Sequence, residues 1–364
     1  MFPRSVMRCL VLLMGGHYAL SACAFQDPLS LPAEPSVLAS RAALTAMARA
    51  GDRIVAVGQR GIVIHADSAN PTLQWHQASV PVSTDLTGVA FPTPREGWAV
   101  GHGAVVLHSV DQGATWVKLI DGKTLGETAL AYYESSAAEP SAERREALLE
   151  QARRLAEEKE AQPFLDVWFK DAKTGYVVGT FNRIFRTDDG GEHWTPLIDR
   201  TDNPEELHFY AVRGFGNELY LAGERGMVWR WDEARSAFID VRTPYTGSLF
   251  GLIVTPQAVL AYGMRGSLYR STDRGAHWQQ IATGLRAGII AGDLRPGGEI
   301  VLVAQSGDAI VSKDGGQTFQ PLPLAGREMA AGILAAANGS LVVIGPAGVR
   351  EALAGEGQPE RSPR

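Results

Sequence analysis

Short apolar runs alternate with turn residues along most of the chain. Four such runs make one unit, as in Leu86–Phe91, Gly97–Val100, Ala104–Leu107 and Trp116–Leu119. The second run of each unit ends in a small residue, and these anchor residues are Gly58, Gly101, Gly179, Gly223, Gly263, Ala304 and Gly345. Successive anchors are 43, 78, 44, 40, 41 and 41 residues apart. Units of about 40–50 residues with four antiparallel strands are typical of propeller blades. The pattern therefore predicts an all-β fold, a seven-bladed β-propeller of four-stranded antiparallel blades.

Four of the units also carry the motif Ser/Thr-x-Asp-x-Gly-x-x-Trp after the third run, here called the Asp box. Its Asp can accept hydrogen bonds from the turn's own N–H groups, its Gly can adopt a positive φ, and its Trp can bury a large surface. Because the motif recurs, we interpret its aspartates as structural turn residues rather than catalytic acids. Blade 1 retains only Asp67 and Trp75, and blade 4 only Trp231-Asp232 and Phe238. The box residues are Asp111, Gly113, Trp116, Asp189, Gly191, Trp194, Asp273, Gly275, Trp278, Asp314, Gly316 and, in place of Trp, Phe319.

The longest gap holds an insertion between blades 2 and 3, at residues 121–162, where strand character disappears. Within it, Ser141–Glu160 has the pattern of a helix, with Leu148, Ala152 and Leu155 as a narrow apolar stripe among charges. One interpretation is a solvated helix that lies lightly on the ring. The alternative is a lid or a docking element for a partner.

The seventh unit is short, because the chain after Arg350 is poor in strand-forming residues. We expect residues 28–33 to supply the outer strand of blade 7 and so to cover an open sheet edge. A single propeller domain then covers residues 25–355, and residues 356–364 form a disordered tail.

Residues 1–24 have the features of a signal peptide: Arg4 and Arg8, an apolar stretch too short to span a bilayer, and a small-residue cleavage site ending at Ala24. Cleavage there predicts an exported, periplasmic protein. The same region also fits a lipobox with Cys23 as the lipidated residue, so a lipid-anchored form in the cell envelope is the alternative.

Composition narrows the partners. Cys9 and Cys23 are the only cysteines, so a form cleaved after Ala24 has no disulfide and no Cys-based site. Without Arg4 and Arg8, 32 basic residues stand against 40 acidic ones, a net charge of about −8. This balance argues against nucleic acid or an anionic membrane face as the main partner. We expect a monomer that meets a membrane only through a partner or an anchor at Cys23.

Strand alternation assigns the loops to two rims. The turns between second and third strands, together with the inter-blade loops and the insertion, lie on one rim, and the Asp boxes lie on the other. The first rim carries Arg60, Arg183, Arg225 and Arg265, which suit carboxylate recognition on a partner chain. The alternative is that these arginines pair with neighbours such as Glu224.

The histidines give little reason to expect a metal or another cofactor. His65 and His108 occupy the repeat position of Arg186, Arg230 and Arg270, and His193 and His277 both precede a box Trp. A residue that recurs at one repeat position serves the blade. The chain also has no His-x-His or His-Glu-x-x-His spacing.

With its Gly-Trp-Ala-Val-Gly strand, its boxes at Asp111, Asp189, Asp273 and Asp314, and seven units, the chain resembles exported Asp-box propellers of the photosystem II stability/assembly factor family. The resemblance implies a non-enzymatic scaffold whose arginine-bearing surface holds a membrane-protein partner during assembly. The insertion departs from the photosynthetic members, and the family has bacterial branches outside photosynthesis. We therefore expect a different envelope or inner-membrane client, such as a transporter component.

The competing class is a glycoside hydrolase, because sialidases and some glucanases also carry Asp boxes. The chain lacks the Arg-Ile-Pro opening of sialidases, and its Tyr133-Glu134 pair lies in the insertion. A glucanase-like enzyme needs two carboxylates across the channel, for which Asp85, Asp166 and Asp202 are the candidates. Two such groups about 5–10 Å apart in a cleft would favour hydrolysis.

Overall fold

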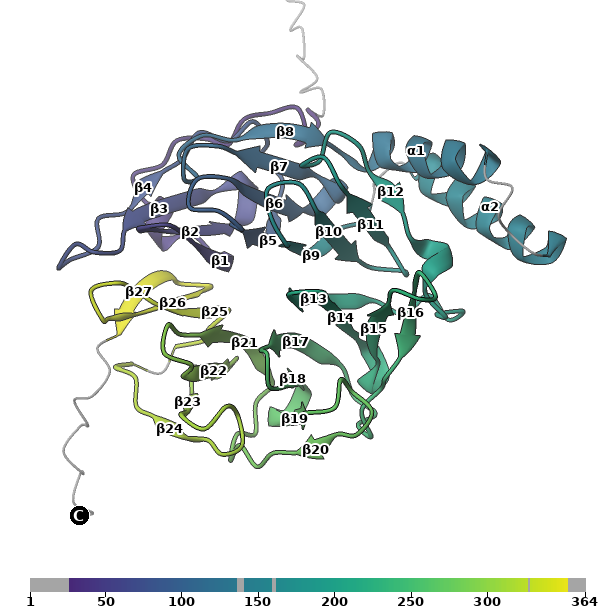
Figure 1. Cartoon of the computed structure of the whole chain (residues 1–364). Coiled ribbons are helices and arrows are strands. Elements are labelled where there is room, and N and C mark those ends of the chain that lie inside the picture. Colours follow the sequence, from purple (N-terminus) through teal and green to yellow (C-terminus); the bar gives the residue numbers. More distant parts are fainter. Residues whose placement is uncertain (1–25, 136–140, 159–161, 327, 353–364) are drawn as a thin grey trace, which may run out of the picture.

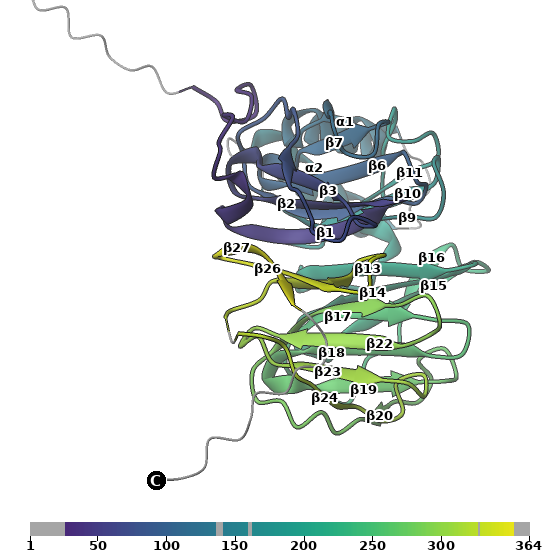
Figure 2. The same ribbon diagram turned by 90° about the vertical axis from the view of Figure 1, so that its left-hand side faces the viewer.

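A computed structural model describes residues 26–135, 141–158, 162–326 and 328–352 as seven antiparallel sheets around a central channel (Figure 1). Six sheets have four strands, and the sheet of blade 7 has three within these ranges. The seven-bladed propeller is thus confirmed. Figure 2 shows the blades stacked side by side around the ring.

The strands of each blade run outward from the channel in chain order. The inner strands are β1 (Leu44–Ala50), β5 (Leu86–Ala90), β9 (Phe164–Phe169), β13 (Phe209–Phe215), β17 (Leu249–Val254), β21 (Ile289–Leu294) and β25 (Gly332–Ala335). The second strands are β2 (Arg53–Gly58), β6 (Gly97–Gly101), β10 (Gly175–Gly179), β14 (Glu218–Gly223), β18 (Val259–Gly263), β22 (Ile300–Ala304) and β26 (Leu341–Gly345). All seven anchor residues therefore end a second strand.

The third strands are β3 (Val63–Asp67), β7 (Val106–Ser109), β11 (Ile184–Thr187), β15 (Val228–Asp232), β19 (Leu268–Ser271), β23 (Ala309–Ser312) and β27 (Gly348–Ala352). The outer strands are β4 (His76–Gln77), β8 (Val117–Ile120), β12 (Thr195–Pro196), β16 (Ala237–Asp240), β20 (Gln279–Gln280) and β24 (Gln320–Leu322). Four short 3₁₀ turns join second to third strands: η2 (Gln59–Gly61), η3 (His102–Ala104), η5 (Glu224–Gly226) and η6 (Met264–Gly266).

The anchor residues are small because another backbone lies against them. A Cβ added at Gly58 would lie 2.1 Å from the carbonyl oxygen of Ala43, in the loop that leads into the same blade. The inner strand has a register shift at this point in each of blades 1 to 6. The second strands themselves are buried along their length, except at the first residues of β2 and β14, and this burial gives each blade its core.

The expectation for residues 28–33 is wrong. Ser83 N donates to Pro28 O at 2.8 Å, Ala33 N donates to Val80 O at 3.0 Å, and Lys118 Nζ donates to Leu29 O. The segment therefore lies on blades 1 and 2. Its apolar side chains pack on the core cluster between those blades, which gives them more burial than an outer edge could.

The insertion forms two helices, α1 (Gly122–Ser135) and α2 (Ala142–Glu157). The predicted helix is α2, whose N-cap Ser141 accepts a hydrogen bond from Arg144 N. Figure 1 places both helices at the periphery beside β12, not over the channel mouth. Leu148 and Ala152 of the predicted stripe are buried, in a cluster that includes Ile198 of η4 (Ile198–Arg200).

Several predicted segments lie outside the described residues: the signal peptide at 1–24 with Cys23, and the tail at 356–364. Within the described ranges, no helix has the length and apolar character needed to cross a membrane.

Candidate functional site

The Asp boxes form one repeated hydrogen-bond pattern. In blade 2, Asp111 Oδ1 accepts from Thr115 N at 2.9 Å, and Ser109 Oγ donates to the same oxygen. Ser109 Oγ in turn accepts from Gly113 N, whose φ is 80°, and Trp116 Nε1 donates to Gly113 O at 3.0 Å. Blades 3, 5 and 6 repeat the Ser/Thr–Asp–Gly part of the pattern. These carboxylates are thus fully engaged in building turns.

The hydrogen bonds also stabilise the charged carboxylates. Bonds from the backbone and side chain of His277 lower the pKa of Asp273 to about 2. Bonds from the side chain and backbone of Thr318 lower the pKa of Asp314 as well. A group that is charged at every physiological pH and bonded on both oxygens is a poor general acid.

Each box turn also packs against the preceding blade. The box glycine of blade 2 approaches Val55, the box glycine of blade 3 approaches Trp98, and Gly316 of the blade 6 box approaches Leu260. These three apolar residues share one position, three residues before their anchors. Trp98 Nε1 donates to Gly190 O at 2.9 Å. Arg270 Nε makes an analogous bond to Gly315 O, also at 2.9 Å. A box turn therefore fills the junction between two blades and receives hydrogen bonds on its carbonyl oxygens.

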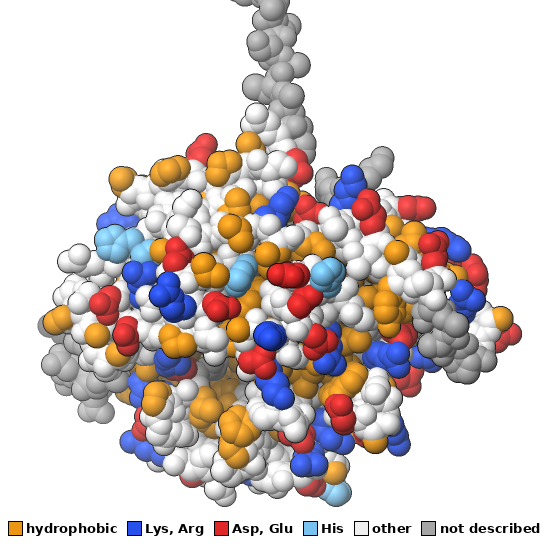
Figure 3. Space-filling model, turned by 45° about the horizontal axis from the view of Figure 1, so that its top comes forward, with side chains coloured by type: hydrophobic (Ala, Val, Ile, Leu, Met, Phe, Trp, Pro, Cys, Tyr) orange, Lys and Arg blue, Asp and Glu red, His pale blue; other side chains and the backbone are white. Residues whose placement is uncertain are grey.

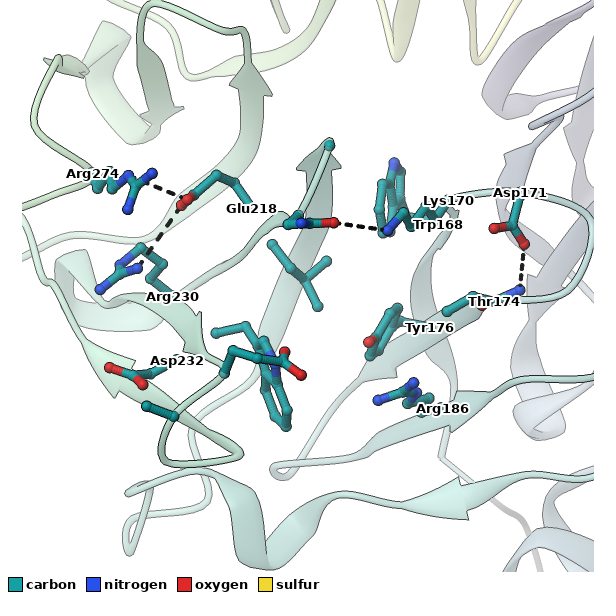
Figure 4. Close-up of a pocket in the computed structure, with 16 residues that line it drawn as sticks. Trp168, Lys170, Asp171, Thr174, Tyr176, Arg186, Glu218, Arg230, Asp232 and Arg274 are labelled. Atoms are coloured by element: carbon teal, nitrogen blue, oxygen red, sulfur yellow. Dashed lines mark hydrogen bonds and ion pairs between the residues drawn. The ribbon is translucent and has the colours of Figure 1, made fainter.

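Blade 4 lacks the box, and the junction between blades 3 and 4 contains a groove of about 750 Å³, here called the box-side groove (Figure 4). Its lining includes three aromatic residues, Trp168, Tyr176 and Trp231. It also includes charged residues of both signs from β11, β14, β15, the turns that follow β9 and β15, and the box turn of blade 5. The charged residues are Lys170, Asp171, Arg186, Glu218, Arg230, Asp232, Glu233 and Arg274.

Glu218 organises one wall of this groove. Its carboxylate accepts from Tyr220 Oη at 3.0 Å and pairs with Arg274 Nε at 3.2 Å. Arg230 Nη1 lies 3.9 Å from it, and Arg230 Nε is buried without a partner among the described residues. On the opposite wall, Trp168 and Tyr176 stack with ring centroids 6.2 Å apart, and Arg186 lies over Tyr176. The lining thus offers aromatic faces and an incompletely bonded arginine.

Sequence reasoning noted the missing box in blade 4 but did not predict the groove. The signal was available, because Trp231-Asp232 stands where the other blades carry Ser or Thr before the Asp box. Its consequence depends on packing between two blades, which a single repeat does not reveal.

On the opposite rim, three of the four predicted arginines are exposed. Arg60, Arg225 and Arg265 each lie two residues after an anchor, with φ of 54°, 54° and 57°. Arg225 pairs with the exposed Glu205. No partner for the side chain of Arg60 or Arg265 is found in the described part of the chain. We call this face, with its second-to-third-strand turns and inter-blade loops, the insertion rim.

Arg183 is not on this surface, which corrects the sequence prediction. Its side chain is 3 % exposed and donates to both carboxylate oxygens of Glu158, at 3.1 and 2.9 Å, and to Gln162 O. Arg183 comes four residues after its anchor, whereas the position that corresponds to the other three is Phe181. Arg183 therefore points into the junction with the insertion.

An aromatic row extends along the same rim from blade 3 to blade 5. Phe181 contacts His208 with ring centroids 4.7 Å apart, His208 contacts Tyr210 at 6.3 Å, and Tyr210 meets Phe250 edge-on at 5.6 Å. Phe181 is 46 % exposed, and Met264 is exposed to a similar extent. The rim thus combines exposed arginines with accessible apolar surface. On the side shown in Figure 3, by contrast, acidic and basic side chains are interspersed.

The candidate carboxylates Asp85 and Asp166 are engaged in other contacts. Asp85 Oδ1 accepts from Arg60 N at 2.8 Å. Asp166 Oδ2 accepts from Val212 N at 2.9 Å and is bonded to Arg213. Burial raises the pKa of Asp166, and Arg213 opposes this. The channel cavity itself, lined by Asp166 and inner-strand residues, has a volume of only about 160 Å³.

The Tyr133-Glu134 pair does not reach the channel either. Tyr133 is buried in α1, and its hydroxyl donates to Asp199 Oδ1 at 2.7 Å. Burial, with Asp199 adding to it, raises the pKa of Tyr133, so this phenol stays protonated. It fixes the insertion to η4.

One exposed cluster has the right groups for a metal ion. A carboxylate oxygen of Asp189, one of Glu192 and a ring nitrogen of His193 lie within 4.8 Å of one another. His193 Nδ1 lies 2.7 Å from Asp189, and His277 repeats this contact with Asp273 in blade 5. The histidine–aspartate contact is thus part of the box turn. For His65 and His108, burial lowers the pKa, so both rings are mainly neutral at pH 7.

Residues 150–308 match the model of the family described as Photosynthesis system II assembly factor YCF48. Over this stretch, which is less than half of the chain, the protein is similar to the YCF48 family. A Photosystem II assembly lipoprotein Ycf48 from Synechococcus sp. (strain CC9902) is 32 % identical over 170 residues, which cover 44 % of this chain and 49 % of that protein. The Photosystem II assembly protein Ycf48 of Thermosynechococcus vestitus is 27 % identical over 164 residues, or 42 % of this chain and 45 % of that one. The chain thus spans about half the length of the YCF48 relatives it matches.

Solved structures support the fold over nearly the whole ring. A structure described as YCF48 bound to D1 peptide has a TM-score of 0.59 at 16 % identity, covering 87 % of this chain and 95 % of that one. The WD40 propeller domain of Doa1 has a TM-score of 0.62 at 11 % identity and covers 89 % and 96 %. At these identities the likeness to YCF48 structures concerns the fold.

Proposed function

We propose that this chain is a non-enzymatic assembly factor that holds a segment of a membrane-protein subunit on its insertion rim. The observation that carries the proposal is the recurrence of Arg60, Arg225 and Arg265 at one turn position with positive φ. A non-glycine residue in this conformation costs roughly 1–2 kcal/mol. Blade 2 has Gly103 there, with φ 69°. An arginine placed three times at a strained position suggests a function for its side chain.

The chemistry of the rim suits an extended peptide that bears carboxylates. Guanidinium groups form paired hydrogen bonds with carboxylates, and the turn projects each arginine away from the blade. The row from Phe181 to Phe250, together with Met264, offers apolar contact on the same rim as Arg225 and Arg265. The solved YCF48 structure with a D1 peptide gives precedent for a peptide ligand in this family.

We further propose that the client is an envelope or inner-membrane protein other than a photosystem subunit, such as a transporter component. The α1–α2 insertion and the absence of any photosynthetic feature in the sequence support this. Residues 1–24 support export to the periplasm, and a lipid anchor at Cys23 is the alternative. One of the YCF48 relatives is itself described as a lipoprotein. Cell fractionation of wild type and Cys23→Ser distinguishes the two forms. If the wild type is lipid-anchored, it should be found in the membrane fraction and Cys23→Ser in the soluble fraction.

The test is crosslinking of the tagged chain in intact envelopes, followed by identification of captured membrane proteins. The variant carries Arg60→Glu, Arg225→Glu and Arg265→Glu. The control carries Arg95→Glu, Arg235→Glu and Lys313→Glu, an equal charge change on exposed residues away from the insertion rim. We expect one membrane protein to be captured by wild type and control and lost by the rim variant. Equal capture by all three would refute a role for the rim.

A further inference from the structure

The box-side groove lies at the position where the spacing of the repeat predicts the box turn of blade 4. Blade 4 keeps the spacing of the motif, because Phe238 stands fifteen residues after its anchor, as Trp194, Trp278 and Phe319 do. Only the residues that build the turn differ: Trp231, Glu233 and Arg235 replace the Ser/Thr, Asp and Gly of the box. The result is a hairpin between β15 and β16 that leaves the junction with blade 3 open.

Blade 3 nevertheless retains the surface that contacts a box turn elsewhere. Tyr176 occupies the position of Trp98 and Leu260, which contact box glycines of the following blade. Arg186 occupies the position of Arg270, whose Nε donates to the carbonyl oxygen of Gly315 in the box of blade 6. In this groove no box carbonyl is present, and Arg186 turns to Asp188 of its own blade through Nε and Nη2.

We propose that the box-side groove binds a tight turn from a partner polypeptide, which takes the place of the missing box of blade 4. The occupant is a peptide turn because that is what fills the equivalent junctions in this chain. Its backbone carbonyls accept from Arg186 and from Arg230, whose buried Nε lacks a partner among the described residues. Trp168, Tyr176 and Trp231 supply faces for an apolar or aromatic residue of the turn.

Charge also favours a peptide turn over a polyanion. The lining carries four cationic and four anionic side chains: Lys170, Arg186, Arg230 and Arg274 against Asp171, Glu218, Asp232 and Glu233. A volume of about 750 Å³ suits a ligand of several residues. The groove is on the opposite side of the ring from the insertion rim, so this second site goes beyond the function proposed above.

The probe is a cyclised peptide with the sequence of the blade 6 box, Ser312–Phe319, because its Gly315 carbonyl is the group that Arg270 binds within the chain. Isothermal titration into the full chain should show saturable one-to-one binding. Arg186→Ala should weaken it about tenfold or more, the loss expected for a hydrogen bond from a charged donor. The matched control Arg270→Ala, and the triple rim variant, should leave the affinity within about twofold.

A second variant tests whether the groove itself is the site. Trp231→Ser, Glu233→Asp and Arg235→Gly together restore a box like that of blade 6, with Phe238 already in place. This variant should melt at a higher temperature than wild type and bind no peptide. Absence of binding to wild type at millimolar peptide, or equal affinity for wild type, Arg186→Ala and the restored-box variant, would overturn the proposal. A wild-type dimer in sedimentation that the peptide dissociates would also overturn it, because the occupant would then be a second copy of this chain.

Discussion

Arg49 of blade 1 and Asp293 of blade 6 form a bidentate ion pair across blade 7, although 244 residues separate them. Arg49 Nη1 lies 2.7 Å from Asp293 Oδ1, and Arg49 Nη2 lies 2.6 Å from Oδ2. Between them, Ala335 N donates to Asp293 Oδ2 at 2.9 Å, and Ala335 O accepts from Arg49 Nη2 at 3.1 Å. The inner strand of the three-stranded blade is thus held from both sides. The pair therefore links blade 1 to blade 6 through the inner strand of blade 7.

The pair should contribute strongly to stability, because Asp293 is only 6 % exposed and its carboxylate would be left without an ion-pair partner if Arg49 were replaced. We expect Arg49→Met to lower the free energy of unfolding by about 2–3 kcal/mol. Urea unfolding monitored by tryptophan fluorescence measures it. In a double-mutant cycle with Asp293→Asn, the two losses should be strongly non-additive. Additive losses would show that the two side chains act independently.

The Asp boxes should make the free energy of unfolding depend on pH in the acid range. The pKa of Asp273 is about 2 in the folded chain, below the ordinary value of 3.8, so its contribution is complete above about pH 4 and is lost as the pH falls toward 2. Asp314 acts in the same direction. Urea midpoints measured across this range should fall less steeply for Asp273→Asn than for wild type. Asp232→Asn, in the blade without a box, is the control for the loss of one carboxylate outside a box turn. Parallel curves for all three proteins would contradict the assignment.

Arg183 should attach the insertion to the ring. Arg183→Met leaves Glu158 without its partner, and the local stability of α1 and α2 should fall by about 2–4 kcal/mol. Hydrogen exchange should then accelerate at residues 122–135 and 142–157 while the inner strands keep their protection. Arg225→Met is the matched control, because its pair with Glu205 is exposed and should contribute less than about 1 kcal/mol. Loss of protection throughout the ring would instead give Arg183 a global structural role.

The blades could be predicted because their signal repeats. Each glycine anchor lies where a carbonyl oxygen from the preceding loop crowds the backbone, so the same small residue is required in almost every unit. The helix α1 could not be predicted in this way. It contains Gly122 and Gly126, which lower helix propensity, and Gly126 is required because a Cβ there would lie 2.5 Å from Leu155 O in α2.

The candidate sites were harder to predict because they depend on small differences in position within a turn and on a missing motif. Arg183 shares a turn with Phe181, and a shift of two residues moves the arginine from the rim to a buried ion pair. The box-side groove exists because a motif is missing from one blade. The sequence shows the missing motif, but only packing against Tyr176 and Arg186 shows the space that it leaves.

The strained arginines allow stability and binding to be separated. At Arg265, with φ 57°, glycine can adopt the backbone conformation without the clash of a Cβ, so Arg265→Gly should raise the free energy of unfolding by about 0.5–1 kcal/mol. The same change removes a guanidinium from the insertion rim and should weaken capture of the membrane partner. The neighbouring Met264→Gly is the control for stability alone: Met264 does not have positive φ, so glycine there should lower the free energy of unfolding. Urea unfolding and envelope crosslinking on the same preparations give both readouts. A variant that is more stable yet captures less partner would show that Arg265 is kept for binding, whereas unchanged capture would leave its strain without a functional explanation.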